Sequence, residues 1–203
     1  MTARKKRRTS TTRIDPGPID PGPSGSQPVT LALALGGNVP GNLSGKAAGE
    51  PSPVERTLAW ALRRLEASLG PLRVASLYRT APVSPVPQPD FLNTAALART
   101  ALSPEALLAL AKSLEREAGR RPGVRLGPRP LDVDILLYGD LQMETPELTL
   151  PHPRMRERRF VLVPLAEIAP DLTVPPDGAR VADLLARLGE GETVERVDWG
   201  TSV

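Results

Sequence analysis

Cysteine is absent from this 203-residue chain, which excludes disulfides, thiolate metal sites and cysteine nucleophiles. The chain also lacks any run of about 18 apolar residues, so we expect no membrane-spanning helix. Aromatic residues make up only 3% of the sequence, and just two of them are phenylalanines. The absence of cysteine suits the reducing cytosol, and we expect a cytoplasmic protein.

Proline and glycine are plentiful, with 24 and 17 residues, and they indicate many loops. Hydrophobic residues make up 40% of the chain and charged residues 24%, which is typical of a soluble globular protein. A chain of this length fits one domain and can bury a sizeable core.

Residues 1–28 differ in composition from the rest of the chain. They carry six basic and two acidic residues, whereas residues 29–203 carry 20 basic and 21 acidic residues. The repeats Ile14–Pro18 and Ile19–Pro23 add proline and glycine but little apolar surface. Such a segment cannot offset its ordering entropy, so we expect a disordered tail before a single domain at 29–203. A solvated appendage fits this tail better than a nucleic-acid contact does.

Patterns of apolar residues predict the order strand, helix, strand, strand, helix, strand. The expected strands are Val29–Leu35, Arg73–Thr80, Phe91–Thr100 and Leu131–Tyr138, and the expected helices run from Ser52-Pro53 to Gly70 and from Ser103-Pro104 to Gly119. This order is the ferredoxin-like α+β arrangement, a βαββαβ sandwich. Additional C-terminal elements are expected, namely a strand at Phe160–Leu165 and a short helix at Val181–Leu188.

Two aspartates lie two residues apart in the last strand of this order. Successive strand side chains point to opposite faces, so Asp132 and Asp134 project from the same face. Two carboxylates held so close repel each other unless a cation or a proton lies between them. Oxygen ligands on a rigid element suit magnesium, which adds water and substrate phosphate as further ligands. The alternative is a strand end with solvated aspartates, which an isolated Asp-x-Asp motif would favour.

Four arginines precede this strand, in a loop broken by proline and glycine. They are Arg120, Arg121, Arg125 and Arg129. Guanidinium groups pair bidentately with phosphate oxygens, so arginines beside a magnesium site indicate phosphate handling. The alternative is an ordinary solvated basic loop.

Four blocks of the sequence resemble one known family. They are Leu35–Asn38, Ser76–Asn93, Glu115–Tyr138 and Leu148–Leu165, and they occur in the family's order and spacing over residues 29–172. The family they resemble is 6-hydroxymethyl-7,8-dihydropterin pyrophosphokinase of folate biosynthesis. The resemblance implies transfer of the terminal pyrophosphate of ATP to the hydroxymethyl group of the reduced pterin, with release of AMP.

The resemblance also implies a role for individual residues. Asp132 and Asp134 would hold two magnesium ions, and Arg120 and Arg129 would join them in catalysis on a loop that closes over the phosphates. The residues implied for ATP binding are Lys112, Glu115, Arg120, Arg129, Thr149, His152 and Arg158. The residues implied for pterin binding are Thr80, Val83, Phe91, Asn93 and Phe160. The two phenylalanines would sandwich the flat ring, and the other three would meet its edge.

Two other functions remain open on the residues alone. One is a different magnesium-dependent nucleotidyl or glycosyl transferase that uses Asp-x-Asp. The other is a nucleic-acid-binding module led by the basic tail, which the slight excess of acidic residues in 29–203 disfavours. We expect ATP and a reduced pterin as the small-molecule partners of a monomer, with no membrane or nucleic-acid partner.

Overall fold

The computed structural model describes residues 27–42, 53–84, 87–121 and 127–199. The tail expected at 1–28 lies almost wholly outside these residues, as does Ser52, the expected N-cap of the first helix. Within the described part of the chain, no helix is both long enough and apolar enough to cross a membrane.

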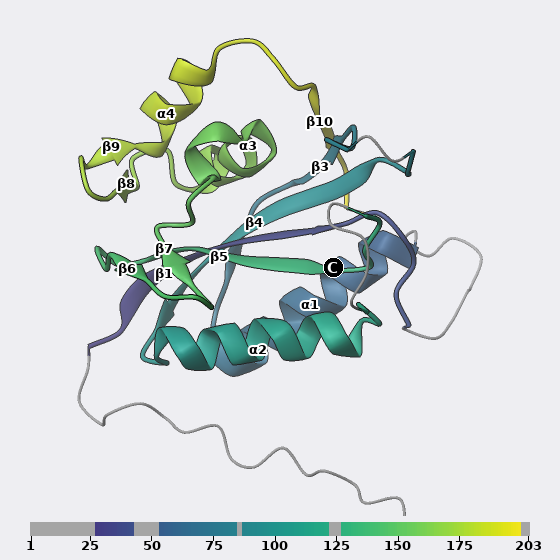
Figure 1. The fold of residues 1–203 in the computed structure, drawn as a ribbon, viewed down its shortest axis with the longest axis horizontal. Coiled ribbons are helices and arrows are strands. Elements are labelled where there is room, and N and C mark those ends of the chain that lie inside the picture. The colour runs from purple at the N-terminus through teal and green to yellow at the C-terminus, as the bar shows by residue number, and fades with distance from the viewer. Residues whose placement is uncertain (1–26, 43–52, 85–86, 122–126, 200–203) are drawn as a thin grey trace, which may run out of the picture.

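A six-stranded sheet forms the centre of the molecule (Figure 1). Its strands are β1 (Val29–Gly37), β2 (Arg73–Val74), β3 (Leu77–Thr80), β4 (Phe91–Thr100), β5 (Asp132–Tyr138) and β10 (Val194–Val197). The hydrogen-bonded order is β10-β3-β4-β1-β5, with β2 beside β4, and the paired strands are all antiparallel. Short hairpins pair β6 (Met143–Glu144) with β7 (Thr149–Leu150) and β8 (Thr173–Val174) with β9 (Ala179–Arg180).

Helices cover both faces of the sheet (Figure 1). On one face lie α1 (Pro53–Leu69) and α2 (Pro104–Glu117). On the other lies α3 (Arg159–Ile168), preceded by the 3-10 turn η1 (Met155–Glu157) and packed against α4 (Val181–Leu188). The prediction of a mixed α and β fold is confirmed, and β4 and α4 have the bounds that the sequence predicts.

The two faces of the sheet carry side chains of different size. In β1, Leu31, Leu33 and Leu35 face α1 and α2 and are at most 2% exposed. The alternate residue Ala32 faces α3 together with Ala95 of β4, and both are fully buried. Because protein interiors are close-packed, these small side chains let α3 lie near the sheet.

The strand predicted at Phe160–Leu165 is wrong, because these residues form the first part of α3. A short continuous apolar run fits a buried strand and a buried helix equally well. The burial pattern has the helical period, with Val161, Leu162, Leu165 and Ile168 all at most 5% exposed. With so few polar residues on its outer face, α3 does not reveal that period in its sequence.

The strand predicted at Arg73–Thr80 is divided into β2 and β3. At the break, the N–H and the hydroxyl of Ser76 donate to the carboxylate of Glu167 on α3, at 2.7 and 2.6 Å. The Tyr78 hydroxyl donates to the same carboxylate at 3.1 Å. Glu167 thus accepts the Ser76 N–H in place of a neighbouring strand, and it links α3 to β3.

We expect Glu167→Gln to lower the free energy of unfolding at neutral pH by about 1–2 kcal/mol, because the amide is a weaker acceptor than the anion. Burial alone would raise the pKa of Glu167, but the hydrogen bonds from Ser76 and Tyr78 outweigh it and hold the pKa below its ordinary value. The stability from this carboxylate is therefore present above the ordinary glutamate pKa and is lost as the pH falls through the lowered value.

Urea unfolding of both proteins across the acidic range measures this effect. The difference between Glu167→Gln and the parent protein should shrink as the pH falls. The exposed Glu144 in β6 offers a matched control, Glu144→Gln, which should change little at any pH. A difference at Glu167 that stayed constant with pH would contradict the assigned carboxylate role.

Candidate active site

A pocket of about 230 Å³ lies between the sheet and the N-terminal end of α3. Its lining residues are Ala34, Leu35, Gly36, Thr80, Val83, Gln88, Phe91, Asn93, Thr94, Arg129, Asp132, Asp134, Arg154, Glu157, Arg158, Phe160 and Glu192. Most of these residues come from β1, from the end of β3 and the adjoining start of β4, from the start of β5 and from the region of α3, while Val83, Gln88, Arg129 and Glu192 lie in connecting segments. The pocket therefore brings together aspartates, arginines and both phenylalanines from distant parts of the chain.

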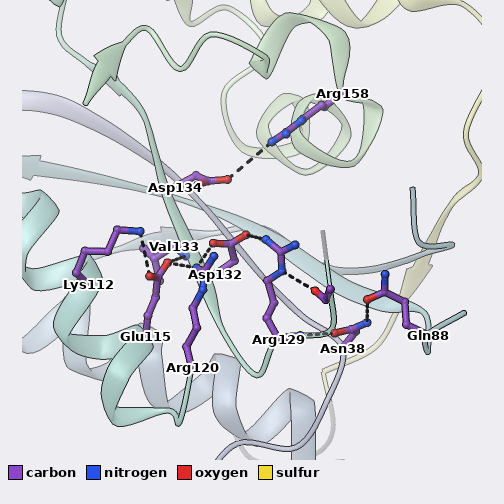
Figure 2. Close-up of polar contacts among 11 residues, drawn as sticks. Asn38, Gln88, Lys112, Glu115, Arg120, Arg129, Asp132, Val133, Asp134 and Arg158 are labelled. Atoms are coloured by element: carbon purple, nitrogen blue, oxygen red, sulfur yellow. Dashed lines mark hydrogen bonds and ion pairs between the residues drawn. The ribbon is translucent and has the colours of Figure 1, made fainter. Parts of the chain in front are cut away.

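Glu115 anchors the basic groups beside β5 (Figure 2). It lies on α2 and is only 3% exposed. Its carboxylate accepts hydrogen bonds from the Val133 N–H at 3.1 Å, from Arg120 at 2.6 Å and from Lys112 at 3.0 Å. Burial raises the pKa of Glu115, although the Val133 N–H and the charge of Arg120 act against it. Glu115 thus fixes Arg120 against the start of β5.

Asp132 is held by two arginines. Arg120 donates to its Oδ1, and Arg129 donates to its Oδ2 at 2.6 Å (Figure 2). Burial would raise the pKa of Asp132, but the charges and hydrogen bonds of these arginines outweigh it and hold the pKa below its ordinary value. Asp132 is therefore ionised at neutral pH, with both oxygens engaged by guanidinium groups.

Asp134 has a different environment, although it lines the same pocket. The Arg158 guanidinium lies 3.9 Å from its Oδ2. Burial, and then the charge of Asp132, raise the pKa of Asp134 to about 6. A cation bound between the two carboxylates would reverse this effect and favour the ionised form.

The two aspartates can supply part of a magnesium coordination shell. Among the residues that the structure describes, no group of three or more acidic, histidine or cysteine side chains is arranged to hold a metal. Magnesium commonly takes one or two carboxylates and keeps water and substrate phosphate as its other ligands. Asp132 and Asp134 fit that chemistry, and they do not fit an all-protein metal cage.

An arginine covers each of the two phenylalanine rings in the pocket. The guanidinium carbon of Arg129 lies 5.8 Å from the centre of the Phe91 ring, and that of Arg158 lies 5.4 Å from the centre of the Phe160 ring. Cation–π contacts of this kind are weak enough to be exchanged for a stronger partner. The aromatic faces and the groups suited to phosphate therefore adjoin each other.

A buried polar edge lies beside these rings. The side-chain amide of Asn93 donates to Thr80 Oγ1 at 2.9 Å, and both residues are at most 6% exposed. A Cβ at Gly36 would lie 2.8 Å from Asn93 Oδ1, so glycine leaves room for this amide. Val83 is 67% exposed and also lines the pocket. All the pterin-binding residues implied by the resemblance thus share one pocket.

Some of the expected ATP-binding residues do not line the pocket itself, namely Lys112, Glu115, Arg120, Thr149 and His152. The first three adjoin it through the network around Asp132, and Thr149 lies in β7. The backbone N–H of Arg154 donates to His152 Nδ1 at 3.2 Å. Burial, and then the charge of Arg158, lower the pKa of His152. His152 is therefore a neutral imidazole at physiological pH, with Nε2 as its donor.

Asn38 is a buried residue of the site to which the sequence analysis gives no role. Its Oδ1 accepts a hydrogen bond from the Arg129 N–H at 2.8 Å, and its own N–H donates to the Arg129 carbonyl at 2.9 Å. Its amide group also donates to Gln88 Oε1 at 2.9 Å (Figure 2) and to the Pro89 carbonyl at 3.0 Å. Asn38 thus positions Arg129. The sequence marks Asn38 in two ways, as the last residue of the first family block and as a polar residue directly after a buried strand.

Four further lining residues with a charged or amide side chain have no role assigned from the sequence: Gln88, Arg154, Glu157 and Glu192. The first three lie within or beside blocks that carry the family resemblance. Glu192 lies well after the last block, and no motif marks it.

The fold and the pocket define a protein of mixed helices and antiparallel strands, with a site suited to an anionic ligand next to a flat ring. Comparison with known proteins identifies the family. The family described as 7,8-dihydro-6-hydroxymethylpterin-pyrophosphokinase (HPPK) has a model that matches residues 32–170. The chain belongs to this family, and the resemblance carried by its four blocks is confirmed.

Curated relatives bear the corresponding name. The 2-amino-4-hydroxy-6-hydroxymethyldihydropteridine pyrophosphokinase of Synechocystis is 38% identical over 173 residues, which cover 84% of this chain and 82% of the relative. The protein of the same name from Methylorubrum extorquens is 44% identical over 144 residues, which cover 70% of this chain and 89% of the relative.

Solved structures share the fold. The HPPK-DHPS S436F/A437G/A613T triple mutant of Plasmodium falciparum matches with a TM-score of 0.62 at 14% identity. The match covers 81% of this chain and 44% of the Plasmodium chain, so this protein spans less than half of that larger one. At this level of identity the similarity concerns the fold alone.

Proposed function

We propose that this protein transfers the terminal pyrophosphate of ATP to the hydroxymethyl group of 6-hydroxymethyl-7,8-dihydropterin, a step of folate biosynthesis. The products are AMP and the pterin diphosphate. One observation beyond family membership carries the proposal: both phenylalanines line the same pocket as a cluster of aspartates and arginines. The flat ring and the phosphates of the two substrates would then meet in that pocket.

The proposed pterin site is the slot between Phe91 and Phe160. The arginines now over these rings, Arg129 and Arg158, are drawn toward phosphate when ATP is present, because a charge-assisted pair is stronger than a cation–π contact. Their movement frees one face of each phenylalanine ring for stacking on the pterin. Val83 is exposed at the edge of the pocket, where the pterin ring can enter from solvent.

The proposed nucleotide site is the basic side of the pocket. Arg120, Arg129 and Arg158 bind phosphate oxygens, and the Nε2–H of His152 donates to another. Lys112, Glu115 and Thr149 complete this side, with Glu115 acting through Arg120 rather than touching phosphate.

Asp132 and Asp134 are the proposed ligands of two magnesium ions. When bound, magnesium would neutralise phosphate charge and act as a Lewis acid on the transferred group. ATP phosphates compete with Asp132 for Arg120 and Arg129, which leaves the carboxylate free for a cation. Substrate binding and the formation of the metal site are therefore coupled in this proposal.

The proposed reaction is a single displacement at the β-phosphorus. The hydroxymethyl oxygen forms a bond to this phosphorus, and the bond from the phosphorus to the oxygen bridging to the α-phosphate breaks. AMP leaves with that oxygen, and the hydroxyl proton passes to solvent. The arginines stabilise the charge that develops on the phosphates, while stacking on the two rings holds the hydroxymethyl group in line.

The strand order β5-β1-β4-β3, with α1 and α2 on one face, supports the ferredoxin-like βαββαβ description of the core. The proposal further includes a monomer that acts in the cytoplasm without a nucleic-acid partner.

Mass spectrometry of the products tests the function. The protein, ATP, magnesium and 6-hydroxymethyl-7,8-dihydropterin should yield AMP and the pterin diphosphate in equal amounts. Formation of ADP, or release of free pyrophosphate, would favour a different transferase. Chelation of magnesium should abolish product, and added magnesium should restore it.

We expect Phe91→Ala and Phe160→Ala each to raise the KM for the pterin about tenfold or more, since each removes one stacking face. The KM for ATP should change less than about threefold, on the argument that ATP does not need the rings. Steady-state kinetics with each substrate varied in turn measures both values. Phe91→Tyr and Phe160→Tyr keep the ring and serve as controls, and equal losses for both substrates would contradict the slot.

A further inference from the structure

The segment that follows α4 forms part of the pocket, although it lies beyond the residues that match the family model. It continues into β10, which pairs with β3 and sets Val194 beside Thr80 (Figure 1). Arg159 donates to the carbonyl of Gly189 and, at 3.2 Å, to the carbonyl of Glu192. The segment is thereby fixed between the β3 edge of the sheet and the start of α3.

This segment contributes one acidic side chain, Glu192, to the pocket. Glu192 Oε1 is buried and has no hydrogen-bond partner among the residues that the structure describes. Buried polar atoms are nearly always paired, so an unpaired one that lines a pocket is available to a ligand. Burial raises the pKa of Glu192, although the nearby charges of Arg159 and Arg158 act against it.

The chemistry of the pocket limits what this oxygen can meet. A carboxylate accepts hydrogen bonds and repels phosphate, so the phosphates of ATP are excluded as its partner. A nitrogen heterocycle with amino and ring N–H groups is a suitable partner for Glu192 Oε1, because these groups donate hydrogen bonds. The backbone N–H of Phe160 hydrogen-bonds to the Glu192 carboxyl and lowers its pKa. Glu192 therefore lies next to a residue whose ring is proposed to stack on the pterin.

We propose that Glu192 is a specificity-determining residue of the pterin site, whose carboxylate accepts a hydrogen bond from an N–H group of the bound ring. The proposal rests on the pterin function proposed above and adds a contact from the C-terminal segment. It assigns this segment a part in substrate selection, in addition to pairing with the edge of the sheet.

Glu192 could instead serve only to anchor the segment at the N-terminal end of α3. The two roles predict different results. If Glu192 is an anchor, its replacement should lower the melting temperature and raise the KM for both substrates, because the whole pocket would become less rigid. A contact to the pterin affects the pterin alone.

The test is steady-state kinetics of Glu192→Gln and Glu192→Ala with each substrate varied in turn, together with thermal unfolding. We expect the KM for the pterin to rise about tenfold or more, as for loss of a hydrogen bond to a charged group. The KM for ATP should stay within about twofold, and the melting temperature of Glu192→Gln should change by less than about two degrees.

Glu195→Gln is the matched control, because Glu195 lies on β10 with its side chain 61% exposed and faces Arg79 at 3.5 Å instead of the pocket. It should leave both KM values unchanged. An unchanged pterin KM in both Glu192 variants, or a parallel rise in both KM values with a lowered melting temperature, would overturn the proposal. If the parent protein formed no pterin diphosphate, the proposed function itself would fail, which is a separate outcome.

Discussion

Asp132→Asn and Asp134→Asn should each lower turnover about a hundredfold or more, because a Lewis-acid metal contributes several kcal/mol and each 1.4 kcal/mol is about tenfold in rate. Either carboxylate alone leaves the proposed magnesium ions short of a ligand beside a polyanionic nucleotide. The double variant should be little worse than the worse single one, since the two aspartates act as a unit.

The two variants should differ in stability without ligands. Asp134 has a pKa raised to about 6 by burial and by Asp132, so its ionised form costs stability as the pH rises through that value. Asp134→Asn removes this cost and should raise the melting temperature at neutral pH. Asp132→Asn should lower it, because Arg120 and Arg129 lose the charge that they share.

Turnover at saturating magnesium and thermal unfolding are the measurements. Asp140→Asn, at an exposed position just after β5, is the matched control and should behave as the parent protein does. If either site variant kept more than a tenth of normal turnover at saturating magnesium, the metal-site assignment would be wrong.

Arg129→Ala should lower kcat about a hundredfold while it changes the KM for ATP less than about fivefold, because an arginine aimed at the transferring phosphate acts mainly in the transition state. The structure adds a reason for this separation. Asn38 holds the backbone of Arg129 through hydrogen bonds in both directions, so only the guanidinium group has to exchange Asp132 for phosphate when the substrate arrives.

The measurement is steady-state kinetics with ATP varied at saturating pterin. Arg129→Lys should recover only part of the loss, since lysine keeps the charge without the bidentate geometry. Arg121→Ala removes an exposed arginine that lines no part of the pocket, and it should have little effect. Equal losses of ATP affinity and turnover at Arg129 would mark it as an ordinary binding residue.

Local patterns were sufficient to predict much of the sheet and most of the helices. The bounds of β4 follow from a mostly apolar run without glycine or proline, which lies between a proline-rich loop and a capped helix. The start of α2 follows from Ser103, whose hydroxyl accepts the Ala106 N–H at 3.3 Å, and from Pro104 at the first helical position. In both cases the information lies within a few residues.

Contacts between distant segments could not be predicted in this way. α3 was expected to be a strand because its apolar run has no visible period, and only packing against the sheet decides between the two. The sequence identifies Asp132 as a candidate metal ligand. It does not show that Arg120 and Arg129 each pair with one of the two carboxylate oxygens of Asp132. Glu192 enters the pocket through tertiary structure alone.

The alanines under α3 have a consequence for how such a pocket can change during evolution. Ala32 and Ala95 set how near α3 lies to the sheet, and the N-terminal end of that helix carries Arg158 and Phe160. The distance between the sheet and the pocket residues on α3 therefore depends on Ala32 and Ala95, which lie beneath the helix. A lineage can alter the shape of its ligand site through positions that never touch a ligand, while every lining residue stays the same.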